Sequence, residues 1–188
     1  MTPGPLLLVA TLGLAAGIVL GPRQPRLWLA LTLVSTLSCL AAALLVLGGG
    51  ADWEWRSVFR IGGEALHWRL DGLAGLFLVL LNVVGGAGAI YAREYWSDEY
   101  HAGSASRGRL WWSAMILSMI FVLLSSNGLH FLVAWELFAV SGYFLITLDR
   151  ARPEVRTAGW LYLAASHAGT LCLFGFFAML AARTGSWE

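Results

Sequence analysis

Lysine is absent from this 188-residue sequence, and all 12 of its basic residues are arginines. Charged residues make up only 12% of the chain, whereas about 25% is usual for a soluble domain. Because 59% of the residues are hydrophobic, the composition excludes an ordinary soluble protein and predicts an integral membrane protein. The formal net charge of +1 and the lack of a basic tract also predict that the chain has no nucleic-acid partner.

Signatures of catalytic, nucleotide and metal sites are also missing. The two cysteines, Cys39 and Cys172, lie in apolar runs without metal-ligand spacing, so both are expected to be small buried hydrophobic residues. The glycines of "GGAGAI" (residues 85–90) lack the strand–turn–helix context of a phosphate-binding loop, and close helix packing explains them better. We therefore expect no catalytic residue, no metal site and no bound cofactor in this chain.

Six long apolar segments predict an all-α, multi-pass membrane protein. Each is long enough to cross about 30 Å of hydrocarbon, and they lie near residues 5–21, 27–49, 72–92, 110–126, 129–148 and 157–182. The first segment lacks a positively charged flank and further apolar segments follow it, so we expect a retained span and not a cleaved signal peptide. Only "SSNG" separates the fourth and fifth segments, which predicts an antiparallel helical hairpin turning at Asn127 and Gly128.

The distribution of the arginines predicts the orientation in the membrane. The connections after the first, third and fifth segments hold eight of them, namely Arg23, Arg26, Arg93, Arg107, Arg109, Arg150, Arg152 and Arg156. The other side holds Arg56, Arg60, Arg69 and Arg183. Because positively charged loops tend to stay in the cytoplasm, this bias predicts an N-terminus outside the inner (cytoplasmic) membrane of a prokaryote.

The connection between the second and third segments, "ADWEWRSVFRIGGEALHWRLDG", has the pattern of a β-hairpin near residues 51–70. Polar and apolar residues roughly alternate on both sides of Gly62 and Gly63, a pair that suits a two-residue turn. By the arginine distribution this hairpin is extracytoplasmic, where it could contact a neighbouring subunit. The alternative is a partly ordered loop.

Glu136, in "VAWELFAVSGY", is the only acid predicted well inside a span. It lies about 10 Å from the start of the fifth segment at about 1.5 Å per residue. An acid at that depth costs roughly 2.5–3.5 kcal/mol to insert. A carboxyl group held there can take up and release protons, as a proton relay or ion pathway requires. The alternative is a protonated acid that hydrogen-bonds to a neighbouring helix and only fixes packing.

Four other polar residues are weaker candidates for a proton pathway. His167 lies in the sixth segment near Thr170, where an imidazole can pass protons on, although a buried, hydrogen-bonded histidine is an equal alternative. Asn82 in the third segment and Tyr143 in the fifth could also line a polar track. His130 lies near a helix end and is expected at the membrane interface.

Three stretches of the sequence resemble known membrane subunits. "LDGLAGLFLVLLNVVGGAGAIYAREYW" (residues 70–96) resembles the third-helix region of the antiporter-like subunits of the complex I/Mrp superfamily. "NGLHFLVAWELFAVSGYFLI" (residues 127–146) resembles the opening of their proton-translocating domain, including its Trp-Glu pair. "TAGWLYLAASHAGTLCLFGFFAML" (residues 157–180) is most similar to the sixth helix of the large membrane subunit of hydrogenase-4 and formate hydrogenlyase complexes, the group 4 membrane-bound nickel–iron hydrogenases.

The resemblance implies that Glu136 pairs with a lysine in a later, broken helix. No lysine is present here, so the chain is expected to be the N-terminal part of such a subunit, either as a truncated gene product or as a fragment of a longer chain. Residues 1–126 would then form the first four helices with the hairpin near 51–70. Residues 127–188 would form the fifth and sixth helices, at the start of a truncated proton-translocating domain.

The function implied by the resemblance is that of a non-catalytic, proton-translocating subunit of a multisubunit membrane oxidoreductase. Its expected partners are the lipid bilayer, other membrane subunits of a respiratory or hydrogenase complex, and a peripheral arm that carries the redox centres. Within the same class, a subunit of an NADH-quinone oxidoreductase or of an Mrp-type Na⁺/H⁺ antiporter is the alternative. From other classes, a structural membrane scaffold and a small-solute transporter with Glu136 in its substrate site remain open.

Overall fold

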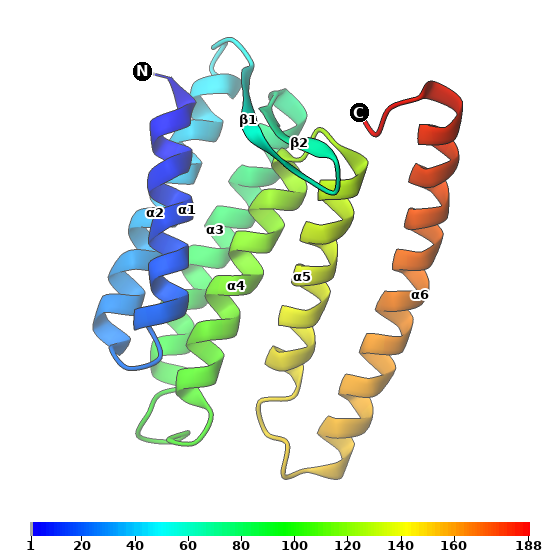
Figure 1. Ribbon diagram of the computed structural model, residues 1–188. Helices are drawn as coiled ribbons and strands as arrows, with labels where there is room; N and C mark the ends of the chain where they lie inside the picture. The colour runs from blue at the N-terminus through cyan, green and yellow to red at the C-terminus, as the bar shows by residue number, and fades with distance from the viewer. Residues whose placement is uncertain (1) are drawn as a thin grey trace.

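The protein, in a computed structural model that describes residues 2–188, consists of six long helices and one two-stranded antiparallel sheet (Figure 1). The helices are α1 (Pro3–Leu20), α2 (Pro25–Leu47), α3 (Gly72–Tyr95), α4 (Ala105–Leu124), α5 (Gly128–Ile146) and α6 (Pro153–Thr184), and the strands are β1 (Trp53–Ile61) and β2 (Glu64–Leu70). All six helices are long and apolar enough to cross a membrane. The predicted fold class, a helical multi-pass membrane protein, is confirmed. The division between residues 1–126 and 127–188 stays a prediction.

Local signals in the sequence set where several helices begin. Asp71 caps α3 by accepting a hydrogen bond from the Ala74 amide at 2.9 Å, and Asn127 caps α5 by accepting from two backbone amides. Proline lies in the first turn of α1, α2 and α6. The first N–H groups of a helix have no acceptor within the helix, so the N–H that proline lacks costs no hydrogen bond there. Because of this, α6 begins at Pro153, ahead of the predicted start at residue 157.

Helices α1 to α4 form a packed bundle, with α5 beside α4 and α6 on the outer side of α5 (Figure 1). The buried Trp28 donates from Nε1 to the Ser113 hydroxyl oxygen at 2.9 Å, which joins α2 to α4 inside the bundle. Cys39 is buried in this core as predicted, whereas Cys172 is exposed on α6. The prediction of burial was wrong for Cys172 because that face of α6 has no neighbouring helix within residues 2–188.

Arg109 ties together the loops at one end of the bundle. α4 begins before the predicted start at residue 110, so Arg109 lies within the helix and not in the preceding loop. Its guanidinium group donates to both carboxylate oxygens of Asp98 at 3.0 Å and to the backbone carbonyls of Gly21 and Pro22 at 2.9 Å. The side chain is only 9% exposed. One arginine therefore joins the α1–α2 loop, the α3–α4 loop and α4.

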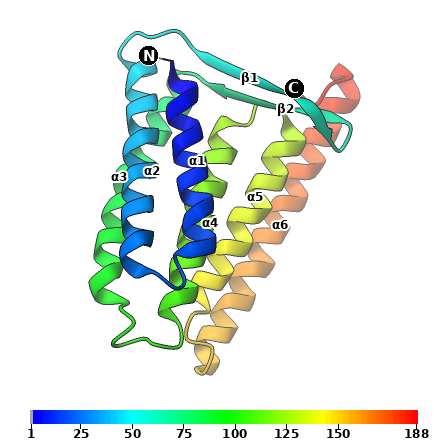
Figure 2. The same ribbon diagram turned by 60° about the vertical axis from the view of Figure 1, so that its left-hand side comes forward.

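The connection between α2 and α3 folds into a β-hairpin that lies across the ends of the helices (Figure 2). Gly62 and Gly63 form its turn with φ angles of 64° and 87°, a backbone conformation that favours glycine. The predicted hairpin is confirmed, while its extracytoplasmic location stays a prediction. Both chain ends lie on the hairpin's side of the bundle (Figure 2), as an even number of spans requires.

Contacts within the chain hold the hairpin in place. Nε2 of His130, in the first turn of α5, lies 3.2 Å from the carbonyl oxygen of Ile61 at the end of β1. Arg56 on β1 makes a bidentate ion pair with Glu188, in which both N···O distances are 2.9 Å. The hairpin thus connects to α5 and to the segment that follows α6.

α6 lies at the edge of the molecule, and of its 32 residues only Gly159 is buried. Glycines allow α5 and α6 to approach each other. A Cβ added at Gly142 would lie 2.5 Å from the Tyr162 hydroxyl oxygen, and one added at Gly128 would lie 2.6 Å from the Phe177 ring. The α5–α6 interface therefore depends on small residues near both ends of α5.

Candidate functional site

Glu136 lies near the middle of α5 and faces α6. It is the ninth of the 19 residues of the helix, about 12 Å from its start at about 1.5 Å per residue. Its Oε2 lies 3.4 Å from Nε2 of His167 on α6, which is within ion-pair distance. Its Oε1 is buried and accepts no hydrogen bond from residues 2–188. The structure thus joins the strongest predicted candidate to one of the weaker ones, and we name them the acid–imidazole pair.

The second nitrogen of His167 determines how its imidazole is protonated. Nδ1 lies 2.9 Å from the carbonyl oxygen of Leu163, one turn earlier in α6. A carbonyl oxygen can only accept a hydrogen bond, so Nδ1 carries a proton and Nε2 of the neutral ring presents its lone pair. That lone pair is the group that faces the carboxyl of Glu136.

The acid–imidazole pair can therefore share one mobile proton. Either a protonated Glu136 donates to Nε2, or the imidazolium of His167 donates to the carboxylate. The N···O distance of 3.4 Å is slightly longer than that of a direct hydrogen bond, for which proton transfer requires about 2.6–3.2 Å. The unpaired Oε1 leaves the carboxyl free to exchange its proton on a second side.

An open cavity of about 560 Å³ borders the pair. α5 lines one side of it and α6 the other, and the lining is apolar except for Glu136, His167 and Thr170. The Thr170 hydroxyl donates to the Ser166 carbonyl at 3.1 Å, which leaves its oxygen able to accept a hydrogen bond. Among residues 2–188 no group of three or more His, Cys, Asp or Glu side chains is placed to hold a metal ion. Glu136, His167 and Thr170 are therefore the polar side chains that this cavity exposes.

The other predicted pathway residues lie elsewhere in the fold. Asn82 is buried in the bundle and donates to the Leu78 carbonyl of its own helix at 2.8 Å. Tyr143 is near the end of α5, where the Arg150 guanidinium carbon lies 5.9 Å from its ring centre. His130 supports the hairpin. No hydrogen bond within residues 2–188 joins these three residues to the acid–imidazole pair, and their part in a pathway stays a prediction.

The sequence does contain a signal for this pairing. Glu136 lies 12 residues before residue 148, the predicted end of the fifth span, and His167 lies 10 residues after residue 157, the predicted start of the sixth. Two consecutive spans run antiparallel, so these two positions fall at nearly the same depth. Equal depth on adjacent helices could have linked the acid to the imidazole.

Comparison with known proteins gives relatives among membrane transport and hydrogenase subunits, although no family model matches the chain. An uncharacterized protein of Mycobacterium tuberculosis (strain ATCC 25618 / H37Rv) is 31% identical over 123 residues, which are 65% of this chain and 19% of the relative. Hydrogenase-4 component B of Escherichia coli (strain K12) is 25% identical over 120 residues, 64% of this chain and 18% of the relative. A probable K⁺/H⁺ antiporter subunit of Rhizobium meliloti (strain 1021) is 30% identical over 120 residues, 64% of this chain and 12% of the relative.

The chain matches only about a fifth of the length of these curated relatives, or less. Its fold is also found in a solved structure, that of the Mrp complex from Dietzia sp. DQ12-45-1b. The two superpose with a TM-score of 0.76 over 100% of this chain and 20% of the matched chain, at 24% sequence identity. The likeness therefore covers the whole length of this chain.

Proposed function

We propose that the chain forms part of a proton-translocating subunit. The reason is that it belongs to the antiporter-like membrane subunits of the complex I/Mrp superfamily. The subunit works within a multisubunit membrane oxidoreductase of the hydrogenase-4 and formate hydrogenlyase type, in the cytoplasmic membrane of a prokaryote. The acid–imidazole pair beside an open cavity supports this function. Redox chemistry belongs to partner subunits in a peripheral arm, and this chain binds no cofactor itself.

The pair supports translocation because its net charge follows the number of protons bound. With the shared proton absent the pair is negative, with one proton it is neutral overall, and with two it is positive. In a medium of low dielectric constant these states differ strongly in energy. A charge that appears or disappears nearby therefore drives protons onto or off the pair. The family resemblance assigns such a charge to a lysine outside these residues.

Replacement of Glu136 by Gln tests the proposal, because it keeps the shape of the side chain and removes the titratable proton. We expect proton translocation by the assembled complex to fall about 10-fold or more, while assembly persists. Translocation is measured with a pH-sensitive dye in membrane vesicles, and assembly by native gel electrophoresis. A carboxyl infrared band that changes with pH should vanish in the variant.

Glu154→Gln is the matched control, because Glu154 is an exposed acid in the first turn of α6. It should translocate protons like the wild type. If Glu136→Gln translocates as well as this control, the relay function is wrong. If Glu136→Gln instead fails to assemble, the alternative of a structural scaffold is favoured.

A cation/proton antiporter subunit is the second candidate, and the 30% identity to a probable K⁺/H⁺ antiporter subunit supports it equally well. The two functions differ in what drives the protons. An antiporter collapses an imposed pH gradient when Na⁺ or K⁺ is added without any electron donor. A hydrogenase-type complex moves protons only when its peripheral arm turns over, and its neighbouring genes encode a hydrogenase large subunit.

A further inference from the structure

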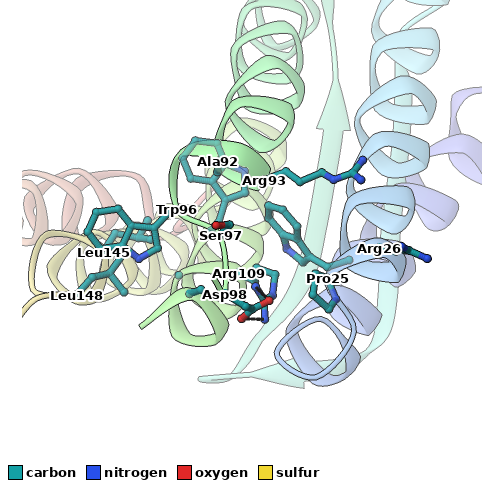
Figure 3. A pocket seen from close by; sticks show the side chains of 14 residues that line it. Pro25, Arg26, Ala92, Arg93, Trp96, Ser97, Asp98, Arg109, Leu145 and Leu148 are labelled. Carbon is teal, nitrogen blue, oxygen red and sulfur yellow. Dashed lines mark hydrogen bonds and ion pairs between the residues drawn. The ribbon is translucent and has the colours of Figure 1, made fainter. Parts of the chain in front are cut away.

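A second cavity, of about 260 Å³, lies at the end of the bundle that holds eight of the twelve arginines. We call this end of the bundle the arginine-rich end. The cavity is formed where the C-terminal ends of α3 and α5 meet the N-terminal ends of α2 and α4 (Figure 3). It lies apart from the acid–imidazole pair and plays no part in the function proposed above.

The charged side chains around this cavity carry a net positive charge. Asp98 is the only acid in the lining, and Arg109 binds both of its carboxylate oxygens. Two further arginines, Arg26 and Arg93, line the cavity and are exposed. Arg93 Nε lies 4.0 Å from a carboxylate oxygen of Glu94, whose side chain is 88% exposed, so this contact is weak. The unneutralised charge favours an anionic ligand.

Two neutral hydrogen-bond donors also line the cavity. Nε1 of Trp112 and the hydroxyl oxygen of Ser97 are buried, and neither has a hydrogen-bond partner among residues 2–188. An indole N–H can only donate, and a buried donor without a partner is costly. Phosphate oxygens accept several hydrogen bonds at once, so a phosphate group suits this combination of guanidinium, indole and hydroxyl donors.

The opposite side of the cavity is apolar. Figure 3 shows Leu145, Leu148 and the Trp96 ring on one side of the Asp98–Arg109 pair, and Arg26 and Arg93 on the other. Tryptophan side chains favour the headgroup level of a bilayer, and Trp96 and Trp112 both line this cavity. Its volume is below the about 300–1,000 Å³ of a site for a drug-sized molecule, so it holds a headgroup and leaves acyl chains outside.

We propose that this cavity binds the phosphate of an anionic phospholipid from the leaflet at the arginine-rich end. Arg26 and Arg93 contact the headgroup, Trp112 and Ser97 donate hydrogen bonds to it, and the acyl chains lie along the apolar side. Free phosphate shares the anionic chemistry but gains nothing from the apolar wall. The bound lipid therefore fills the space between α2, α3, α4 and α5 at the membrane surface.

The test measures lipid binding to the protein purified from its membrane in mild detergent, with the subunits it retains. Fluorescent phosphatidylglycerol is titrated, and unlabelled phosphatidylcholine and inorganic phosphate serve as competitors. A basic residue near the membrane surface contributes about 5-fold in affinity for anionic lipid. The Arg26→Gln/Arg93→Gln variant should therefore bind about 25-fold more weakly than the wild type.

The matched control is Arg60→Gln/Arg183→Gln, which removes two exposed arginines at the opposite end. It should bind like the wild type, and Arg26→Lys/Arg93→Lys should retain most of the affinity because the charges remain. Trp112→Phe, which removes the N–H together with the five-membered ring of the indole, should bind several-fold more weakly. Equal losses in the control and the test variant would overturn the proposal. So would competition by phosphatidylcholine at equal affinity, or full displacement by millimolar inorganic phosphate.

Discussion

Replacement of Arg109 by Gln should destabilise the helical bundle more than any other single change of an arginine. Arg109 makes four hydrogen bonds, two to Asp98 and one each to the carbonyls of Gly21 and Pro22. Glutamine is shorter and neutral, so it can replace at most one of the carbonyl contacts. The variant therefore loses the connection between the α1–α2 loop, the α3–α4 loop and α4.

The size of the effect follows from the geometry. Removal of one partner from a buried ion pair costs about 3–5 kcal/mol. The side chain of Asp98 is 45% exposed, so water compensates for part of the loss. We therefore expect the lower end, about 3 kcal/mol, from the stranded carboxylate and one unpaired carbonyl. For a chain of this length, about 2–4 °C per kcal/mol converts that into a decrease of about 6–12 °C in Tm.

Thermal unfolding in detergent, followed by fluorescence, measures this shift. Arg107→Gln is the matched control, because Arg107 lies two residues earlier, is exposed and makes one 3.3 Å hydrogen bond to the Leu148 carbonyl. Its Tm should change by less than about 2 °C, as for most surface substitutions. The Asp98→Asn variant tests the pairing, since adding it to Arg109→Gln should cost little more. Equal melting of the two arginine variants would refute the reasoning.

Two further predictions concern the hairpin and the α5–α6 interface. The His67 imidazole beside Glu54 holds the pKa of that carboxyl below its ordinary value of 4.5. The ionised carboxyl of Glu54 therefore stabilises the hairpin fully above pH 4.5, and this stabilisation is lost as the pH falls through the lowered pKa. Glu54→Gln should exchange hairpin amide hydrogens faster than the wild type at about pH 6, and this difference should shrink as the pH falls below 4.5. A difference that stays unchanged in acid would contradict this. Gly159→Ala, whose new Cβ meets Thr147, should lower stability by about 1–3 kcal/mol. Gly169→Ala on the same helix is the control, because the space around Gly169 is open, and it should be neutral or stabilising by up to about 1 kcal/mol. Similar melting temperatures of the two alanine variants would exclude close packing at Gly159.

The spans and the hairpin could be predicted because each depends on local properties of the sequence. A run of about 20 apolar residues has few alternatives to a membrane helix. Gly62 and Gly63 between two alternating segments likewise specify a two-residue turn. The helices that start at residues 105 and 153 begin earlier than predicted, because arginines near a helix end look like loop residues on hydropathy alone.

The role of Arg109 and the position of Cys172 could not be predicted in this way. Arg109 is one of eight arginines at its end of the bundle, and only the tertiary fold brings Asp98 and two loop carbonyls to it. Cys172 was expected to be buried because its neighbours in the sequence are apolar. In a membrane helix an apolar residue can face lipid as readily as a core, so hydropathy does not separate the two environments. The same limitation hid which face of α6 meets α5.

The position of the acid–imidazole pair determines which part of the protein responds to a change in its charge. α5 packs on one side against α4 and the bundle, whose interior is joined by contacts such as the one from Trp28 to Ser113. On its other side α5 meets α6, of which only Gly159 is buried. The acid–imidazole pair therefore lies between the close-packed bundle and the helix at its edge. A change in the charge of Glu136 or His167 therefore acts directly on the α5–α6 interface.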